Sequence, residues 1–317
     1  MEAEDTIQEQ KQTGRICEID YLKGILILLM VSFHLVYIEE LYPYAKQVVY
    51  TFHMPCFLLI SGYLMNIRKG WAGFLRTMSR LLVPYVVMES AYTLMASLLP
   101  INEHIEVLTA TVWLDKLLLH PIGPYWYLRT MTICGFLYYV VFRHGGGSSF
   151  SRSVMLGIIY YVLATYAGIV SFVHSLFFLA GVMLRQGGVS FTAAFQPVFY
   201  SVIAFMLLAA GRHNLESYSI GSLLVVFFSF SIGIFTYHIA PSRLRRLLMA
   251  IGRDSLHVFL FSPLFTFVCK FLVPVFRFDP SGLLFLVTSL SVCVSGSLLV
   301  GRVVDGVPLQ HVGRKTE

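Results

Sequence analysis

Long apolar runs separated by short, polar, cation-rich segments make up the hydrophobic pattern of this 317-residue chain. Ten of these runs reach or approach the roughly 20 residues that a helix needs to cross a bilayer. They lie near residues 19–38, 46–66, 80–99, 124–142, 153–168, 171–185, 196–211, 218–238, 253–273 and 281–301. The pattern predicts an all-α, polytopic membrane protein with about ten transmembrane helices in one bundle.

The distribution of lysine and arginine predicts which segments face the cytoplasm. With the N-terminus inside, 16 cations fall in inner segments and five in outer segments. The inner cations are Lys11, Arg15, Arg68, Lys69, Arg76, Arg80, Arg143, Arg152, Arg185, Arg243, Arg245, Arg246, Arg253, Arg302, Arg314 and Lys315. The outer cations are Lys46, Lys116, Arg212, Lys270 and Arg277. Because cytoplasmic loops carry the excess of positive charge, we expect cytoplasmic tails at residues 1–18 and 302–317 and a transmembrane domain at 19–301.

The stretch 153–185 fits either one long helix or two short ones. Arg143 and Arg152 precede it and Arg185 follows it. All three face the cytoplasm only if the chain crosses twice, so we predict two helices with a turn near Gly168.

The composition agrees with a protein of the lipid bilayer. Apolar residues make up 57% of the chain and charged residues 13%, against roughly 25% charge in a soluble domain. The net charge of +6 reflects the inner loops, so no nucleic-acid partner is expected. Five scattered cysteines without a CxxC pair are typical of small apolar residues, and neither a metal site nor a permanently bound cofactor is expected.

Lys23 and His34 are a lysine and a histidine eleven residues apart in the first apolar run. On a continuous helix they lie about 20° apart around the axis and about 16 Å apart along it, which places them on one face. Ionisable groups inside a membrane span are costly and by default indicate function. Asp20 lies one turn before Lys23 and predicts an ion pair with it.

His53 lies in the second run, at a depth similar to that of His34. The two imidazoles are therefore expected to meet in the outer half of the bilayer. Imidazole is the usual group that takes a proton from a hydroxyl. The alternative is that each histidine is a hydrogen-bonded contact between helices.

Arg76 and Arg80 belong to a group of four cations at the inner end of the third run, with Arg68 and Lys69. They share one face if the third helix begins before them. Paired arginines hold phosphate oxygens with directional bonds, so they are candidates for a phosphate site. The alternative is that they only set the topology.

Ser61, Gly62 and Tyr63 close the second run, where glycine permits close approach of a helix or a cofactor. Trp126 and Tyr127 open the fourth run and fit an aromatic belt at the membrane interface.

Arg129 is three residues further into the fourth run. A guanidinium at this depth requires a carboxylate, a carbonyl or a wet cavity. Glu89, in the middle of the third run, is a candidate partner.

Six motifs in this order resemble the acyltransferase-3 family. They are Asp20-x-Leu-Lys23-Gly, His34, Phe52-x-Met-Pro-x-Phe-x-x-x-Ser61-Gly-Tyr63, Arg80-Leu-x-x-Pro-Tyr85, Trp126-Tyr-Leu and Phe177-Phe-x-x-Gly181. Ile251-Gly-Arg-Asp-Ser255-Leu-x-x-Phe adds a likeness to the fucose 4-O-acetylase-like branch. The resemblance covers roughly residues 15–301.

The resemblance implies a ten-span O-acyltransferase of the plasma (inner) membrane. Such an enzyme moves an acyl group, usually acetyl, from cytoplasmic acyl-CoA to a carbohydrate hydroxyl at the outer face. Acetyl-CoA is then a donor substrate, the acceptor is a cell-surface or lipid-linked glycan, and a homodimer is one possible assembly.

The resemblance also gives roles to the candidate residues. In the family a lysine or arginine precedes the catalytic histidine with ten residues between, which Lys23 and His34 match. The expected site residues fall into three groups. They are His34, Lys23, Asp20 and His53 for catalysis; Arg76, Arg80, Ser61, Gly62 and Tyr63 for the donor; and Trp126, Tyr127, Arg129 and Glu89 for the acceptor.

Two departures from the family pattern keep other functions open. Relatives often have two residues between the paired arginines, whereas Arg76 and Arg80 have three, with Thr77 at the expected position. Ser262-Pro263 stands where relatives commonly have His-Pro. A transporter or flippase, or a sensor that binds a glycan or acyl-CoA without turnover, are the alternatives.

Overall fold

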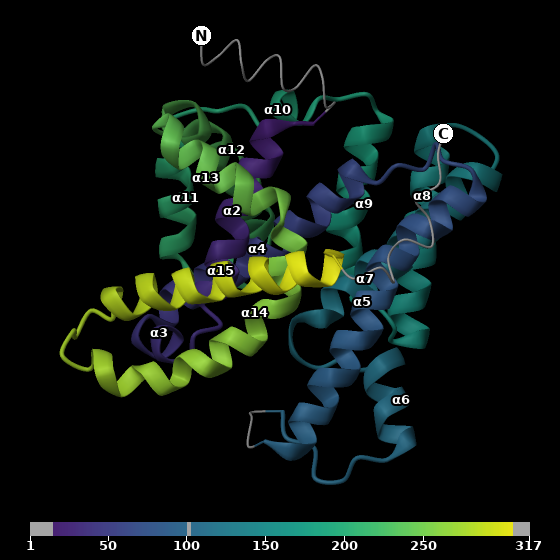
Figure 1. The fold of residues 1–317 in the computed structure, drawn as a ribbon. Coiled ribbons are helices and arrows are strands. Elements are labelled where there is room, and N and C mark those ends of the chain that lie inside the picture. The colour runs from purple at the N-terminus through teal and green to yellow at the C-terminus, as the bar shows by residue number, and fades with distance from the viewer. Residues whose placement is uncertain (1–14, 100–102, 307–317) are drawn as a thin grey trace. The chain divides into compact units, whose positions relative to one another are not determined.

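The computed structural model describes residues 15–99 and 103–306 (Figure 1). Most of these residues are helical, and none of them lies in a strand. The helices group into two compact units. Unit 1 holds the chain up to His53 and from Phe195 onward, and unit 2 holds Met54–Ala194. The chain passes from unit 1 to unit 2 within one helix, α4 (Pro43–Leu64).

Unit 1 contains the first part of α4 together with described helices from both ends of the chain. Its other elements are α2 (Cys17–Ser32), α3 (Val36–Leu41), α11 (Tyr200–Ala210), η3 (Arg212–Leu215), α12 (Ile220–Ile239), α13 (Ser242–Arg253), α14 (Ser255–Cys269), η4 (Lys270–Phe276) and α15 (Leu283–Gly306).

Unit 2 contains the rest of α4 and the middle of the chain. Its other elements are α5 (Trp71–Leu98), α6 (Ala110–Leu118), η1 (Gly123–Tyr125), α7 (Trp126–His144), α8 (Ser149–Val162), the π turn η2 (Leu163–Ala167), α9 (Phe172–Gln186) and α10 (Phe191–Ala194).

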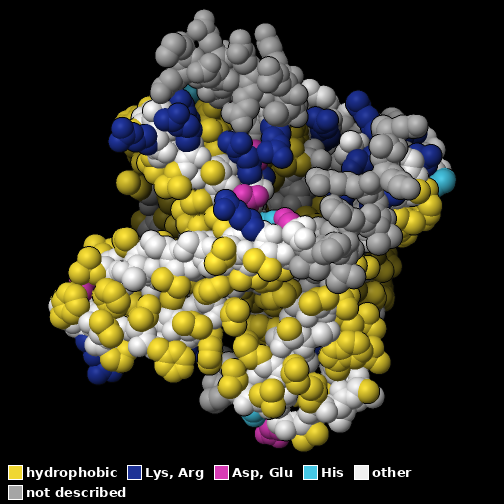
Figure 2. Space-filling view, viewed as in Figure 1, with side chains coloured by type: hydrophobic (Ala, Val, Ile, Leu, Met, Phe, Trp, Pro, Cys, Tyr) yellow, Lys and Arg dark blue, Asp and Glu magenta, His cyan; other side chains and the backbone are white. Residues whose placement is uncertain are grey.

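Among the residues that the structure describes, five helical segments are long and apolar enough to cross a membrane. They are Trp71–Leu98, Ser149–Ala167, Ile220–Ile239, Ser255–Phe276 and Leu283–Gly306. A helix also lies within each of the other five predicted runs, and α9 and α11 are apolar but shorter. Hydrophobic side chains are spread over the visible faces of α14 and α15 (Figure 2), as expected of surfaces that contact lipid. The total of ten spans and the orientation of the termini stay predictions.

The first apolar run is two helices and not one, which corrects the predicted span 19–38. α2 ends at Ser32, and α3 begins at Val36. At the break the His34 N–H donates to the carbonyl of Val31, one residue closer than in an α-helix. The carbonyl of Met30 instead accepts a hydrogen bond from the His34 ring. A histidine side chain that satisfies one of the last carbonyls is a known way to end a helix.

The predicted pair of helices in 153–185 is confirmed. α8 ends in a π turn, Gly168 adopts a left-handed φ of 64°, and α9 starts at Phe172. Glycine takes this conformation without the cost that a Cβ would add.

The segment 239–252, predicted as an inner loop, forms helix α13. It packs on α2 with backbones almost in contact: a Cβ at Gly24 would overlap the Leu248 carbonyl, and a Cβ at Gly252 would overlap the Asp20 carbonyl. Glycines at both positions thus permit the close crossing of α2 and α13.

The helices overrun the predicted domain limits slightly. α2 begins at Cys17 and α15 extends to Gly306. Most of both predicted tails, including Lys11, Arg314 and Lys315, lies outside the described residues.

Candidate functional site

His34 lies at the break between α2 and α3, where its ring is half-buried. Its Nδ1 atom is 2.7 Å from the carbonyl oxygen of Met30. A carbonyl oxygen only accepts, so Nδ1 carries the proton and donates it. In a neutral imidazole the other nitrogen, Nε2, then holds a lone pair. Within the described residues, no hydrogen bond or ion pair occupies that nitrogen.

The Tyr50 ring contacts both His34 and His53, and the expected meeting of the two imidazoles stays a prediction. The Tyr50 ring centre is 5.9 Å from that of His34 and 5.1 Å from that of His53. Its hydroxyl donates to the carbonyl of Phe33 at 3.0 Å, which fastens α4 to the end of α2. His53 is buried, and its Nδ1 donates to the carbonyl of Val49 at 2.8 Å.

Lys23 and Asp20 form the predicted ion pair on α2. Lys23 Nζ is 2.7 Å from Asp20 Oδ1, and the two side chains are 19% and 14% exposed. The angle of about 20° that placed Lys23 and His34 on one face was derived for an unbroken helix. Because α2 ends at Ser32, that alignment does not extend to His34.

Arg76 and Arg80 lie four residues apart on α5, which begins at Trp71. The helix thus starts before both of them, as the shared face requires. Both side chains are exposed, and no ion pair of either arginine occurs within the described part of the chain. Nearby, Lys69 Nζ donates to Thr77 Oγ1 at 2.9 Å. The two guanidinium groups are available to an anionic ligand.

Gly62 marks a close crossing of α4 and α9 inside unit 2. A Cβ at Gly62 would overlap the carbonyl of Phe178, and a Cβ at Gly181 would overlap that of Leu59. Helix packing therefore accounts for Gly62, and its role toward a cofactor stays a prediction.

The residues on either side of Gly62 are also engaged within unit 2. Ser61 Oγ donates to the carbonyl of Phe57 at 2.8 Å and lies 2.7 Å from the hydroxyl of Tyr127. The Tyr63 hydroxyl accepts from the Phe191 N–H at 3.1 Å, and Arg185 lies over the Tyr63 ring.

Trp126 stacks on His174, with ring centres 4.5 Å apart and planes 24° apart. The sequence analysis did not single out His174. It lies at the start of α9, which is distant from Trp126 in sequence, so no local spacing indicates the contact.

The Arg129 guanidinium donates hydrogen bonds to backbone carbonyls and not to the carboxylate of Glu89, its candidate partner. Its Nη1 donates to the carbonyls of Leu118, at 2.8 Å, and Leu119. Glu89 is fully buried, and its Oε1 accepts from the Ile122 N–H at 2.8 Å. Glu89 Oε2 and Arg129 Nε have no hydrogen-bond partner among the described residues.

A family model described as an acyltransferase domain matches residues 17–300, which is most of the chain. The chain belongs to the acyltransferase-3 family. No curated protein and no solved structure matches it. The family and the apolar helices together identify a multi-pass membrane acyltransferase.

In this acyltransferase, the residue that the sequence resemblance compares with a histidine of relatives is Ser262. Ser262 is 2% exposed within α14 and is followed by Pro263. The nearest histidine on that helix, His257, lies at its start and pairs with Asp305 at 3.3 Å. Whatever a histidine at this position does in relatives, no imidazole stands at residue 262 here.

Tyr50, which contacts both His34 and His53, was not among the predicted site residues. It precedes His53 by three residues, so the two share a face of α4. That spacing was the available signal.

Proposed function

We propose that this membrane acyltransferase moves an acetyl group from cytoplasmic acetyl-CoA to a hydroxyl of a cell-surface or lipid-linked glycan at the plasma membrane. The single observation that carries the proposal is the His34 ring: Nδ1 is fastened to the Met30 carbonyl and Nε2 has no protein partner among the described residues. This is the arrangement of a general base, because the ring is held in one tautomer and one orientation.

In the proposed reaction, Nε2 of His34 removes the proton of the acceptor hydroxyl. The oxygen then forms a bond to the thioester carbonyl carbon, the carbon–sulfur bond breaks, and the leaving CoA thiolate takes a proton from the imidazolium. The Met30 carbonyl stabilises the charged ring while it holds that proton, since Nδ1–H donates to it.

The supporting residues have separate proposed roles. Arg76 and Arg80 bind phosphate oxygens of the CoA part of the donor, together with Ser61–Tyr63. Lys23 and Asp20, which form an ion pair on α2, belong to the proposed catalytic residues. Trp126, Tyr127, Arg129 and Glu89 contact the acceptor. Tyr50 is a positioning residue, because its ring contacts the His34 ring and its hydroxyl donates to the Phe33 carbonyl. His53 supports Tyr50 through their ring contact.

The first experiment is product analysis. The full chain is expressed in a host that lacks it, and surface and lipid-linked glycans are compared by mass spectrometry with those of the host alone. We expect glycan species heavier by one acetyl group that disappear on mild alkaline treatment, which cleaves O-esters and leaves N-acetyl groups.

A second readout separates the alternatives. Purified protein in liposomes is given acetyl-CoA, and release of free CoA is measured with and without a glycan extract. A transporter or a sensor would release no CoA in either case, and that result with well-inserted protein would contradict the proposal.

A further inference from the structure

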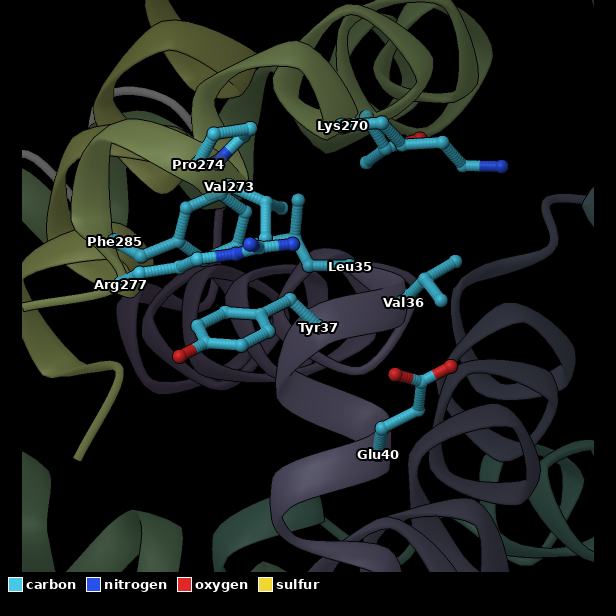
Figure 3. Close-up of a pocket in the computed structure, with 10 residues that line it drawn as sticks. Leu35, Val36, Tyr37, Glu40, Lys270, Val273, Pro274, Arg277 and Phe285 are labelled. Carbon is cyan, nitrogen blue, oxygen red and sulfur yellow. The ribbon is translucent and has the colours of Figure 1, made fainter. Parts of the chain in front are cut away.

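A cavity in unit 1 lies between α3 and the segment that joins α14 to α15 (Figure 3). It encloses about 340 Å³, at the lower end of the ~300–1,000 Å³ typical of small-molecule sites. Most of its wall is apolar. The lining residues are Leu35, Val36, Tyr37, Glu40, Thr266, Lys270, Val273, Pro274, Arg277 and Phe285. The proposed reaction uses none of them.

Two cations line this apolar cavity without a carboxylate partner. Arg277 has no ion pair or hydrogen bond within the described residues, and the one recorded contact of the Lys270 ammonium is with the Phe267 ring, at 5.6 Å from its centre. In Figure 3 the Arg277 guanidinium lies near Leu35, whereas Lys270 and Glu40 lie at the other side of the cavity and the Lys270 side chain extends away from Arg277. Both cations are exposed and so accessible to an anionic ligand.

Two carboxylates that lie within two residues of cavity-lining residues, Asp279 and Glu39, are already occupied. Asp279 Oδ1 accepts from the Ser281 hydroxyl at 2.6 Å, and Oδ2 accepts from the Leu284 N–H at 2.9 Å. These bonds hold the pKa of the Asp279 carboxyl below its ordinary value. Glu39 pairs with Lys46 at 2.8 Å. Glu40 also lines the cavity, so the three charged lining residues, Glu40, Lys270 and Arg277, carry a net charge of +1.

Exposed apolar side chains on η4 and just after it alternate with the cavity-lining residues. Phe271, Val275 and Phe278 are 73%, 64% and 71% exposed, and each is next in sequence to a lining residue: Lys270, Pro274 and Arg277, respectively. A ligand with an anionic head and a long apolar tail matches both surfaces at once.

We propose that this cavity binds the phosphate of a lipid, with Arg277 on the phosphate oxygens, Lys270 adding positive charge at the other side of the cavity, and the apolar chain along Phe271, Val275 and Phe278. Positively charged arginine and lysine side chains at a membrane interface attract the negatively charged phosphates of lipids. A guanidinium can also donate two parallel hydrogen bonds to one phosphate. Glu40 accepts from hydroxyl or ammonium groups of the head group. The inference concerns binding and does not depend on acetyl transfer.

The lipid phosphate has two possible sources, a membrane glycerophospholipid or an isoprenoid phosphate of the kind that carries glycans. Both present the same chemistry to Arg277. The experiment therefore has one arm for each source and controls for the phosphate and the tail alone.

The test measures binding of tritiated farnesyl phosphate to the purified full chain in a neutral detergent. Farnesol, inorganic phosphate and dioleoyl phosphatidylglycerol are the competitors. We expect farnesol and inorganic phosphate to compete at least tenfold more weakly than unlabelled farnesyl phosphate. Equal competition by phosphatidylglycerol assigns the site to phospholipid, and weak competition assigns it to isoprenoid phosphate; either result supports a lipid-phosphate site.

Three variants make the test specific for the cavity. Arg277→Gln should weaken farnesyl phosphate binding by about 10- to 100-fold, the effect of losing a charge-assisted contact. Glu40→Gln should strengthen binding by removing a like charge, a gain that misfolding cannot produce. Arg212→Gln is the matched control, because Arg212 is another exposed outer cation of unit 1 that lies outside the cavity and over the Tyr44 ring.

The proposal is overturned if farnesol competes as well as farnesyl phosphate. It is also overturned if Arg277→Gln binds like the wild type, or if Arg212→Gln loses as much affinity as Arg277→Gln. In those cases Lys270 and Arg277 serve only as cations at the end of a membrane helix.

Discussion

His34 and His53 each donate from Nδ1 to the carbonyl four residues earlier, at 2.7 Å to Met30 and 2.8 Å to Val49. Their surroundings differ. His34 stands at the end of α2 with a half-buried ring, whereas His53 is 4% exposed and lies inside α4, which continues for eleven more residues. Tyr50 contacts both rings.

The difference shows that the local hydrogen bond alone does not make a histidine a base. The bond fixes the same tautomer in both rings. At His34 it also replaces a backbone hydrogen bond at the end of a helix, and the residue is partly exposed. His53 lies within a continuing helix and is 4% exposed. The greater exposure of His34 makes it the better candidate.

The largest effect expected from this comparison is that of His34→Asn. The asparagine amide can still donate to the Met30 carbonyl, but it has no basic nitrogen. Loss of general-base assistance costs about 10²–10⁴-fold in rate. We expect kcat for acetyl transfer to fall within that range while the thermal unfolding midpoint and acetyl-CoA binding change little.

The companion variant His53→Asn should keep acetyl transfer within about tenfold of wild type, because His53 takes no proton in the proposed reaction. If the two variants lose equal activity, or if His53→Asn alone is inactive, the assignment of the base to His34 is wrong.

A second substitution separates chemistry from donor binding. Replacing Arg76 and Arg80 together by alanine removes two charge-assisted contacts of about 1.5–3 kcal/mol each, which amounts to a loss of acetyl-CoA affinity of up to several hundredfold or more. The KM for acetyl-CoA should rise while kcat at saturating donor stays near wild type, the opposite of the His34 result.

The matched control is the Arg243→Ala, Arg246→Ala double variant, which removes two exposed cations of α13 that are also predicted to be cytoplasmic. If both double variants lower protein yield equally and neither changes the KM, Arg76 and Arg80 only contribute to topology.

The third prediction concerns the folded state and not turnover. His53→Asn shortens a side chain that is 4% exposed and loses the ring contact with Tyr50 at 5.1 Å. Such large-to-small changes of buried groups cost about 1–3 kcal/mol. A lower unfolding midpoint in detergent is expected for His53→Asn, with a smaller decrease for His34→Asn. The reverse order would mean that His34 is the structural residue of the two.

Features that depend on local sequence were predictable. The helices follow the apolar runs, and the Lys23–Asp20 pair follows from residues one turn apart. The break after Ser32 was not predictable from hydropathy, because the apolar run continues through it. Helix α13 was hidden for a different reason: its arginines were counted only as topology signals. Leu244, Leu247, Leu248 and Ile251 nevertheless recur at helical spacing.

Tertiary contacts account for what the sequence could not show. The Trp126–His174 stack and the cavity between residues 35–40 and 266–285 join segments that are far apart along the chain. Arg129 was recognised as needing a partner, but the choice of the Leu118 and Leu119 carbonyls over Glu89 depends on how the loop before α7 folds.

The smallest expected effect tests the residue that links the two histidines. Tyr50→Phe keeps both ring contacts and removes only the hydroxyl that donates to the Phe33 carbonyl at 3.0 Å. A hydrogen bond of this kind contributes about 0.5–1.5 kcal/mol, so acetyl transfer should fall by about two- to tenfold. Because the Phe33 carbonyl adjoins His34, the loss should appear in kcat and leave the KM for acetyl-CoA unchanged. A kcat equal to that of wild type would show that Tyr50 does not position His34, and that the break after α2 holds the ring without help from α4.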